Sequence, residues 1–515
     1  MAPATNVVGR VQQVFVSYKR NIEPDQTIAG QIVAALTAQG HSVFIDQRLK
    51  IGQEWAKEIE AQVTAADYLV VLLTAASSSS EMVRGEIEVA RKAAERDPGR
   101  PKILPIRVQF SDPLPYPLNA WLDKIQYALW NGPSDNDILI QAISAAMTGD
   151  AIESPPPLEP ASAPAAERAP AYAAVLPPPG GAIEVDDPFY IERSADASAT
   201  ALAQRPGQTL VIKGPRQMGK SSLLMRVAAA GANAGKQVAF VDFQLTDERA
   251  RASADTFFQW FAASVVEQLQ LSASPSEHWD AASPTTQNCT YFIEQQVLQV
   301  VQSPVMIVID EADVVFKTTF AADFFSMLRN WHGRRANPIR RAWKRLDLVI
   351  VTAVDPDQFI DRPSESPFNV GVIQVLEDFS PQQMAELNRR HPRPLGTADL
   401  DALFRLVGGH PYLARRALYQ TATAALTTTV NQLVASVDDE MGPFGDHLRY
   451  YMLRIMRTPQ LTSTLKEVLT TGAATNNNVA YRLQAAGLVR RDGAKLVARC
   501  DLYKRYFGMR FGLHG

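Results

Sequence analysis

The sequence predicts an α/β protein of several domains. In the first 150 residues short apolar strands alternate with amphipathic helices, and around residue 214 a glycine-rich loop stands between an apolar strand and a helix. The 515 residues also exceed what one hydrophobic core usually supports. We therefore expect separate α/β domains, each with its own core.

The N-terminal part alternates strands and helices. The expected strands are Val11–Val16, Ser42–Ile45, Tyr68–Leu73, Ile103–Val108 and Ile125–Trp130. The expected helices are Thr27–Ala38, Glu54–Thr64, Ser80–Ala94 and Asn136–Met147. Crossover helices between short strands specify a parallel, doubly wound, five-stranded sheet. In a flavodoxin-like strand order the ligand site lies beyond the carboxyl ends of strands one and three, which selects residues 17–20 and 74–86.

A phosphate-binding loop begins at Gly214, where residues 214–222 fit the pattern GxxxxGK[ST] after an apolar strand and before a helix. Its glycines let backbone N–H groups curl around phosphates, its lysine reaches the β and γ oxygens, and its first serine can bind Mg²⁺. An ordinary glycine turn before a helix is the alternative. The expected nucleotide contacts in the loop are Gly214, Arg216, Gly219, Lys220, Ser221 and Ser222.

Acidic residues end a second apolar strand. Residues 305–309 are all apolar, which predicts a strand buried on both faces, and Asp310 and Glu311 follow. Beside a phosphate loop, Asp310 would hold the metal through water and Glu311 would polarise a hydrolytic water. A further apolar strand, Leu346–Val354, carries Thr352 as a candidate γ-phosphate sensor. The sequence therefore predicts a P-loop NTPase domain.

Composition excludes several classes of protein. The hydrophobic fraction of 46% and the net charge of −3 indicate a soluble globular protein without a general attraction to nucleic acid or membranes. We see neither a signal peptide nor an apolar stretch that could cross a bilayer, and so expect a cytoplasmic protein. The two cysteines, Cys289 and Cys500, are far apart in sequence and indicate neither a disulfide framework nor a zinc site.

A segment rich in proline and alanine divides the chain. Such a segment cannot form sheet hydrogen bonds or bury much apolar area, so we expect an extended tether at 151–181. The expected domains are the N-terminal α/β domain at 1–150, the ATPase core at 182–360, a helical lid at 361–450 and a C-terminal domain at 451–515.

The N-terminal domain resembles a TIR (Toll/interleukin-1 receptor) domain. Residues 14–18 resemble its first strand, 40–46 its second strand, 51–55 its BB loop, and 80–87 the helix that bears the glutamate of NAD-cleaving members. Met82 stands where many members have tryptophan. The resemblance implies that Glu86 is catalytic and NAD⁺ is the substrate. The implied or plausible NAD⁺ contacts are Ser17, Tyr18, Lys19, Asp46, Trp55 and Thr74.

Glu86 suits this reaction chemically. Nicotinamide is cationic in NAD⁺ and leaves as a neutral molecule, so its departure needs no general acid. A carboxylate beside the sugar stabilises the oxocarbenium character that develops and can also hold ribose hydroxyls. On its helix, Glu86 lies at the edge of the expected buried stripe of Val83, Ile87 and Ala90. The residues alone also allow a solvated surface glutamate.

The second half resembles the AAA-like ATPase domain of bacterial signalling proteins, related to STAND switch ATPases. The resemblance spans about residues 183–430 and rests on residues 187–193, the phosphate loop, residues 366–371 and residues 408–413. It implies that ATP or ADP binds with Mg²⁺, that Phe189 and Tyr190 lie near the adenine, and that Pro411 opens a lid helix and approaches the nucleotide.

Residues 461–507 are typical of a winged helix, with helices followed by two short strands around an Asp-Gly turn. Two roles are open. The module could bind DNA phosphates through its basic residues, or it could pack on the nucleotide domain and regulate it. Nearby acidic residues weaken the basic footprint and favour regulation over nucleic acid. The basic residues concerned are Arg482, Arg490, Arg491 and Lys495.

Together these features suggest a switch. Bound nucleotide sets the arrangement of core, lid and winged helix; the activated form makes a homo-oligomer; and the clustered TIR domains cleave NAD⁺ to nicotinamide and ADP-ribose or a cyclic derivative. The resemblance implies a role in bacterial antiphage immunity, triggered by an unknown ligand or partner protein. The alternatives are a non-enzymatic TIR adaptor with an ATPase switch, and a DNA-dependent ATPase that uses the winged helix.

Overall fold

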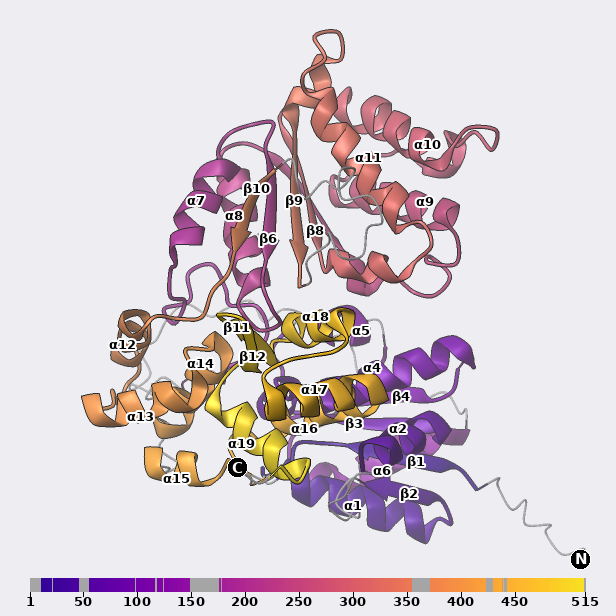
Figure 1. Cartoon of the computed structure of the whole chain (residues 1–515). Helices are drawn as coiled ribbons and strands as arrows, with labels where there is room; N and C mark the ends of the chain where they lie inside the picture. The colour runs from indigo at the N-terminus through magenta and orange to yellow at the C-terminus, as the bar shows by residue number, and fades with distance from the viewer. Residues whose placement is uncertain are drawn as a thin grey trace, which may run out of the picture. The chain divides into compact units, whose positions relative to one another are not determined.

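Figure 1 shows the chain as a computed structural model. The structure describes residues 11–20, 22–45, 55–97, 99–115, 118–123, 125–148, 176, 178–353, 371–422, 429–437, 439 and 442–513. It divides into two compact units. The first comprises Met1–Gly181, Thr423–Thr427 and Ala435–Pro459, and the second comprises Ala182–Ala422, Thr428–Val434 and Gln460–Gly515. The predicted tether lies outside the described residues, except 176 and 178–181.

The first unit is built on a five-stranded parallel sheet of order β2-β1-β3-β4-β5, which confirms the predicted flavodoxin-like fold. Its strands are β1 (Gln13–Ser17), β2 (Ser42–Ile45), β3 (Tyr68–Leu73), β4 (Lys102–Val108) and β5 (Ala128–Trp130). Its helices in the N-terminal part are α1 (Asp25–Ala38), α2 (Trp55–Ala65), α3 (Ala75–Ser78), α4 (Glu81–Arg96), α5 (Leu118–Leu122), the short 3₁₀ helix η2 (Pro133–Asp135) and α6 (Asn136–Thr148). The last strand is shorter than predicted, because the Ile125 N–H turns back to the Leu122 carbonyl.

The register of this sheet places the ends of β1 and β3 together. Val16 lies opposite Ile45 on one side and Val70 on the other, and Ser17 lies opposite Val71. Helices α1 and α6 pack on one face through buried apolar side chains such as those of Ile32 and Ile143. Because the strand order reverses at β1, a crevice is expected where β1 and β3 end.

The second unit has its own parallel sheet, of order β10-β6-β9-β8-β7. Its strands are β6 (Thr209–Lys213), β7 (Gln237–Asp242), β8 (Val305–Asp310), β9 (Leu346–Thr352) and β10 (Val372–Val375). Strands β8 and β9 are buried along their whole length, as their continuous apolar runs predict.

Helices cover both faces of this second sheet (Figure 1). On one face lie α7 (Ser194–Ala203) and α8 (Lys220–Asn233), against Met306 and Val308 of β8. On the other face Ile307 and Ile309 meet an aromatic cluster from the remaining helices. These are α9 (Ala254–Gln268), α10 (Thr285–Phe292) with its π-helical continuation η5 (Ile293–Leu298), and α11 (Ala321–Arg334). The 3₁₀ segments are η3 (Phe243–Leu245), η4 (Pro275–Glu277), η6 (Ala312–Lys317) and η7 (Arg341–Arg345).

The chain then becomes mainly helical. The helices up to the C-terminal domain are α12 (Pro381–Arg389), α13 (Thr397–Val407), α14 (Pro411–Ala422), α15 (Val430–Ala435) and α16 (Gly445–Met456). The C-terminal elements are α17 (Pro459–Thr471), α18 (Asn477–Ala485), β11 (Val489–Asp492), β12 (Lys495–Ala498) and α19 (Asp501–Arg510). Strands β11 and β12 form an antiparallel hairpin whose turn contains Gly493 at φ +59°, as the Asp-Gly pair predicts. The assignment of this region as a winged helix stays a prediction.

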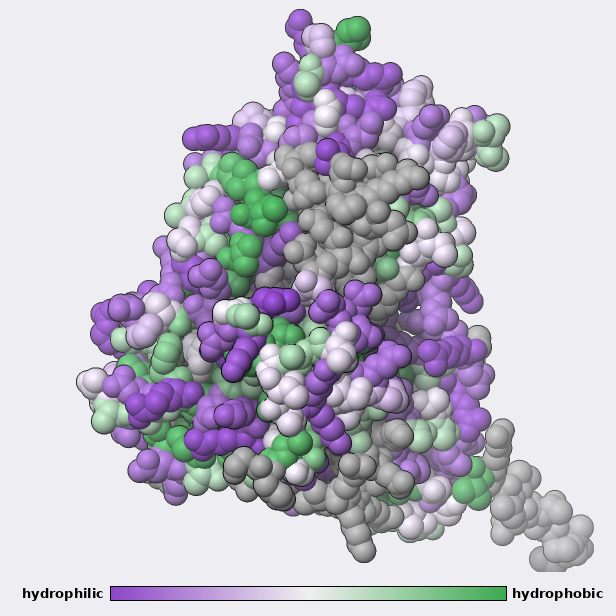
Figure 2. Space-filling view, viewed as in Figure 1, coloured by the Kyte–Doolittle hydropathy of each residue, from purple (hydrophilic) through white to green (hydrophobic). Residues whose placement is uncertain are grey.

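Strand β10 forms one edge of the second sheet and carries an apolar strip. Val372, Ile373 and Val375 are all exposed. Figure 2 shows a hydrophobic area in the region of this strand. A parallel edge with apolar side chains is a surface suited to further strand pairing or packing.

A buried ion pair ties β9 to the loop before β7. Lys236 Nζ lies 2.9 Å from Asp347 Oδ2, and both side chains are 1% exposed. Replacing Lys236 with methionine should lower the free energy of unfolding by about 3 kcal/mol, because the Asp347 carboxylate stays buried without its cation. Urea unfolding measures this loss. The double variant Lys236→Met/Asp347→Leu should recover part of it, and a single variant as stable as the wild type would refute the assignment.

Candidate functional site

Residues that the sequence predicts for the NAD⁺ site meet at the carboxyl ends of β1 and β3. Ser17 is the last residue of β1, and Glu86 lies in the second turn of α4. The Ser17 hydroxyl donates to Glu86 Oε2 at 2.5 Å, and both residues are buried. A charge-assisted hydrogen bond of this kind fixes the carboxylate in one orientation. The resulting site places an oriented glutamate at the switch point of the sheet.

A second buried carboxylate, Asp25, lies at the same end of the sheet and was missed from the sequence. Its Oδ2 accepts hydrogen bonds from Thr74 Oγ1 at 3.2 Å and from the Lys19 N–H at 3.3 Å. Its Oδ1 has no hydrogen-bond partner among the described residues. Burial raises the pKa of Asp25 to about 6, although both hydrogen bonds oppose the rise. Asp25 therefore holds the loop after β1 against the loop after β3.

The other predicted NAD⁺ contacts have different surroundings. Tyr18 is buried in the hydrophobic core formed with α1. Core packing therefore explains an aromatic residue at this position as well as a contact with substrate does. Trp55 is the first residue of α2, and its side chain lies outside the described part of the chain. Asp46 also lies outside the described residues, as do 51–54 of the predicted BB loop.

The raised pKa of Asp25 predicts a pH effect on stability. The folded chain binds the Asp25 proton more tightly than the unfolded chain, in which the pKa has its ordinary value of 3.8. The free energy of unfolding therefore falls as pH rises from about 4 through about 6, and it stays at the lower value above pH 6. Asp25→Asn lacks this titration. The difference in free energy of unfolding between the variant and the wild type should therefore shift by about 2 kcal/mol in favour of the variant from pH 4.5 to pH 7. Urea unfolding at the two pH values checks this. Asp137→Asn, an exposed first-turn aspartate of α6, is the matched control and should show no such gain; equal pH slopes for Asp25→Asn and wild type would contradict the prediction.

The phosphate loop joins β6 to α8 in the second unit, and its backbone has the expected curl. Gly219 has φ +84°, and Gln217, which is not glycine, has φ +63°. A left-handed residue other than glycine stores strain that the surrounding structure must hold, as often happens at functional sites. A Cβ on Gly214 would lie 3.2 Å from Leu376 Cβ, so a larger residue here would crowd Leu376. Arg193, missed from the sequence, supports the loop by donating to the Met218 carbonyl at 2.7 Å.

Acidic side chains face this loop from the ends of β7 and β8. The Ser221 hydroxyl donates to Asp310 Oδ2 at 2.9 Å. Asp242 ends β7 directly opposite Asp310 in the register, and its Oδ2 has no hydrogen-bond partner among the described residues. Glu311 follows at φ +52°, again a left-handed residue other than glycine. The strand ends therefore gather negative charge beside the loop.

The protonation of these groups reflects burial and mutual repulsion. Burial and the nearby Asp310 charge raise the pKa of Asp242 to about 8. Burial and Glu311 raise the pKa of Asp310 to about 7, against the hydrogen bond from Ser221. Burial lowers the pKa of Lys220, which the three neighbouring acidic residues Glu311, Asp313 and Asp310 oppose. Carboxylates that repel one another in this way suit a bound divalent cation.

Mg²⁺ fits this set of donors when a nucleotide is present. Across the residues that the structure describes, no three His, Cys, Asp or Glu side chains are placed to hold a metal ion by themselves. Mg²⁺ commonly uses one or two protein oxygens together with substrate phosphates. The Ser221 hydroxyl and the Asp310 carboxylate, already in contact, are the protein oxygens suited to this.

The remaining predicted nucleotide contacts lie around the loop with varied roles. Thr352 is the last residue of β9, is fully buried, and lies opposite Lys213. The Ser222 hydroxyl accepts from the Ile183 N–H at 2.9 Å. Pro411 is the first residue of α14, as the lid prediction requires. The Phe189 ring packs under the Arg415 guanidinium, 3.9 Å from its centroid, and so is directed at the lid.

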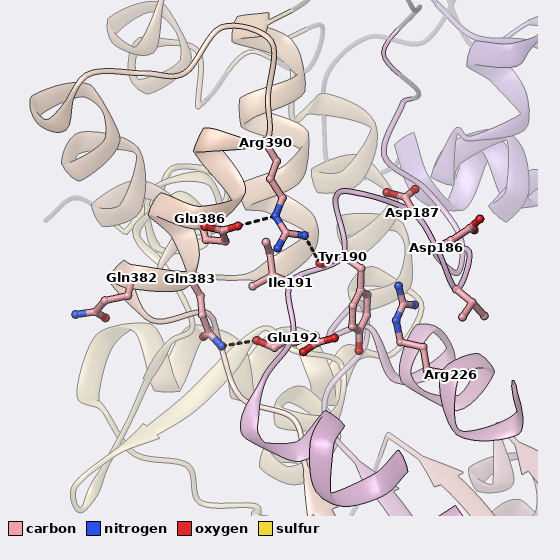
Figure 3. A pocket seen from close by; sticks show the side chains of 11 residues that line it. Asp186, Asp187, Tyr190, Ile191, Glu192, Arg226, Gln382, Gln383, Glu386 and Arg390 are labelled. Atoms are coloured by element: carbon pink, nitrogen blue, oxygen red, sulfur yellow. Dashed lines mark hydrogen bonds and ion pairs between the residues drawn. The ribbon is translucent and has the colours of Figure 1, made fainter. Parts of the chain in front are cut away.

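A cavity of about 430 Å³ lies between residues 185–192, α8 and the α12 region (Figure 3). Tyr190 lines it, with the Arg226 guanidinium 3.3 Å from the centre of its ring. On the other side Arg390 donates to the Tyr190 carbonyl at 2.7 Å and to Glu386 at 2.8 Å. Arg193, which contacts the phosphate loop, directly follows this lining segment. The volume is within the range of small-molecule sites.

The predicted winged-helix region meets the phosphate loop inside the second unit. The Arg216 N–H donates to the Ala485 carbonyl at 3.1 Å, and Arg499 Nη2 lies 2.7 Å from Asp378 Oδ1 and 2.9 Å from Met218 Sδ. These contacts pack the C-terminal region against the phosphate loop. The basic residues considered for DNA are nevertheless exposed: Arg482, Arg490, Arg491 and Lys495.

Two families match the chain. Residues 178–509 match the AAA-like domain family, and residues 14–142 match the TIR domain family. A curated relative, an uncharacterized WD repeat-containing protein from Synechocystis, is 26% identical over 357 residues. The match covers 64% of this chain and 30% of that protein, so the chain spans less than a third of its relative's length.

Solved structures resemble the ATPase part only remotely. The Walker-type ATPase of Pyrococcus abyssi is 12% identical, with 62% of this chain and 96% of that chain covered and a TM-score of 0.42. The ORC2 protein of Aeropyrum pernix is 15% identical, with 63% and 96% covered and a TM-score of 0.38. In the described part of the chain, no helix is both long enough and apolar enough to span a membrane.

Proposed function

The chain belongs to the AAA-like domain family, and from this premise we propose that it is a nucleotide-controlled switch whose clustered TIR domains cleave NAD⁺. The products are nicotinamide and ADP-ribose or a cyclic derivative. The observation that carries the proposal is the hydrogen bond from Ser17 to Glu86, which orients a carboxylate at the switch point of the TIR sheet.

The chemistry at the TIR site needs one negative charge in a fixed place. As the bond between nicotinamide and ribose breaks, positive charge develops on the sugar, and Glu86 stabilises it. Ser17 keeps the Glu86 carboxylate in position, and Lys19 offers a cation to the dinucleotide phosphates. Asp25 positions the loops that carry Lys19 and Thr74. The surrounding apolar core excludes water from the carboxylate, which strengthens its electrostatic effect.

In the ATPase site, the phosphate loop binds the phosphates of ATP or ADP and the cavity beside Tyr190 receives the base and ribose. Ser221 and Asp310 hold Mg²⁺, which neutralises the phosphate charge when bound. Glu311 orients the hydrolytic water, and Thr352 senses the γ-phosphate at the end of β9. The contacts of Ala485 and Arg499 with the loop connect the C-terminal region to the state of the nucleotide.

We further propose that activation makes a homo-oligomer in the cytoplasm, in response to a ligand or partner protein that is not identified. Clustering raises the local concentration of TIR domains, so a site completed by a neighbouring copy becomes active by mass action. The biological role proposed from the TIR resemblance is antiphage immunity through NAD⁺ depletion or a nucleotide signal.

Nicotinamide release measured together with oligomer size tests this function. The purified full chain is incubated with NAD⁺ and Mg²⁺, with ATP, with ADP or without nucleotide, while light scattering follows its mass. The proposal predicts nicotinamide release that rises with the oligomeric fraction. Oligomers that leave NAD⁺ intact under all three conditions would favour the non-enzymatic adaptor instead.

A further inference from the structure

Helix α16 packs in the first unit although its neighbours in sequence pack in the second. It spans the boundary between the predicted lid (361–450) and the predicted C-terminal domain (451–515), but residues 435–459 belong to the unit that contains the TIR domain. Every residue from 445 to 453 is buried, and the helix contacts α4 and α2 of the TIR domain. Residues 435–459 therefore pack with the TIR domain, although the chain before and after them belongs to the second unit.

The first turn of α16 binds the rim of the proposed NAD⁺ site. Asp446 forms an ion pair with Lys19, the cation proposed for the dinucleotide phosphates. The same carboxylate accepts a hydrogen bond at 3.2 Å from Ser80, the residue that caps the N-terminus of α4. Asp446 thus occupies, with its own negative charge, the place where a phosphate would pair with Lys19.

The residues that follow Asp446 in α16 pack on the helix that carries Glu86. His447 Nδ1 lies 2.8 Å from Glu81 Oε2, and both side chains are at most 5% exposed. The Tyr450 ring covers Gly85, the residue before Glu86, so closely that a Cβ there would lie 3.2 Å from the ring. Glu86 itself, one residue further along α4, is 3% exposed. A dinucleotide therefore cannot reach Glu86 in this arrangement.

Hydrogen bonding is incomplete where α16 packs on the TIR domain, as expected of a contact that forms and breaks. Arg449 is 2% exposed and pairs with Asp446 at 2.6 Å, but its Nε and Nη1 have no hydrogen-bond partner among the described residues. A buried guanidinium with unsatisfied donors destabilises the docked state. The docked and released states are then closer in free energy than a fully satisfied interface would allow.

We propose that α16 is an internal plug that keeps the TIR active site closed until rearrangement of the flanking lid and C-terminal segments withdraws it. This inference rests on the proposed NAD⁺ cleavage and adds its regulation. Because both ends of α16 continue into the second unit, a nucleotide-dependent movement there can pull the helix without any new partner. Asp446 and NAD⁺ compete for Lys19, so substrate and plug exclude each other.

Releasing the plug should activate the enzyme. The full-chain variant Asp446→Ala loses the contacts with Lys19 and Ser80, and we expect nicotinamide release without added nucleotide to rise at least about fivefold. The matched control is Asp501→Ala, which removes an exposed ion pair with Arg505 on α19 and should leave the rate unchanged. An Asp446→Ala rate equal to that of the wild type would overturn the plug.

Locking the plug should do the opposite. Ser80→Cys/Asp446→Cys replaces a hydrogen-bonded pair with two thiols, whereas the native Cys289 and Cys500 are buried. Oxidation of the double variant should lower nicotinamide release about tenfold or more under activating conditions, and reductant should restore it. Equal rates in the oxidised and reduced forms, with the disulfide verified by mass, would overturn the plug while leaving NAD⁺ cleavage intact.

Amide hydrogen exchange separates this inference from the function on which it rests. If no form of the protein cleaves NAD⁺, the proposed function fails, and exchange in residues 81–90 of α4 still tests the contact. Faster exchange there in Asp446→Ala than in wild type, with no change in Asp501→Ala, supports a releasable contact. Unchanged exchange would overturn it.

Discussion

Replacing Glu86 with glutamine is expected to reduce nicotinamide release by a factor of about 100 or more. Glutamine preserves the volume and can still accept the hydrogen bond from Ser17, but it lacks the negative charge that stabilises the developing oxocarbenium ion. Affinity for ATP should not change, because Glu86 belongs to the TIR fold and not to the phosphate-loop fold. High-performance liquid chromatography of nicotinamide, under conditions in which the wild type oligomerises, measures the effect.

Glu88 provides the matched control for Glu86. It lies two residues further along α4, has a side chain 30% exposed and pairs with Lys92. Glu88→Gln should therefore keep the wild-type rate within about twofold, because surface ion pairs contribute little. A Glu86→Gln enzyme that retains a third or more of the wild-type rate would remove Glu86 from the mechanism.

Replacing Lys220 with alanine should weaken ATP and ADP binding by a factor of about 100 or more. Lys220 is almost fully buried beside the acidic strand ends, and its ammonium donates to the Pro215 carbonyl of the loop at 3.0 Å. In the nucleotide complex we expect the ammonium to contact phosphate oxygens. Loss of a charge-assisted contact to phosphate costs about 3 kcal/mol. Calorimetric titration with ADP and Mg²⁺ measures the change.

An exposed lysine of the same unit serves as control for Lys220. Lys344 lies in the η7 segment and is exposed, so Lys344→Ala should bind ADP as the wild type does. If Lys220→Ala bound ADP within threefold of the wild type, the phosphate loop would not be the nucleotide site.

The TIR fold could be predicted because its determinants are local. Each strand is a short apolar run and each helix has an apolar stripe, so the order of elements follows directly, and the sheet order places Ser17 near the end of β3. The role of Asp25 could not be predicted in the same way. An aspartate at the start of a helix usually interacts with exposed N–H groups, and only the fold brings Thr74 to this one.

In the nucleotide site too, local motifs could be predicted from the sequence and contacts made by the fold could not. The phosphate loop and Asp310 each belong to a contiguous motif, and the structure places Ser221 in contact with Asp310 across 89 residues of sequence. Asp242 ends an apolar strand in the same way as Asp310, and this pattern could have marked it as a site residue. Only the strand register, which places Asp242 opposite Asp310, shows that the two carboxylates are neighbours.

Helix α16 could not be assigned from the sequence because its partners are distant. The apolar pattern of residues 445–456 is compatible with packing in either unit. Its placement depends on polar pairs such as His447 with Glu81, which are 366 residues apart. Long-range pairing of this kind leaves no periodic trace in either segment.

The dependence of NAD⁺ cleavage on nucleotide, compared between wild type and Lys220→Ala, tests the central claim most directly. Both proteins have the same TIR domain with Glu86 intact, so only coupling between the two sites can make them differ. We predict that nicotinamide release by the wild type changes about tenfold between ATP, ADP and no nucleotide, whereas release by Lys220→Ala does not respond. Equal release by both proteins under all three conditions would contradict the account.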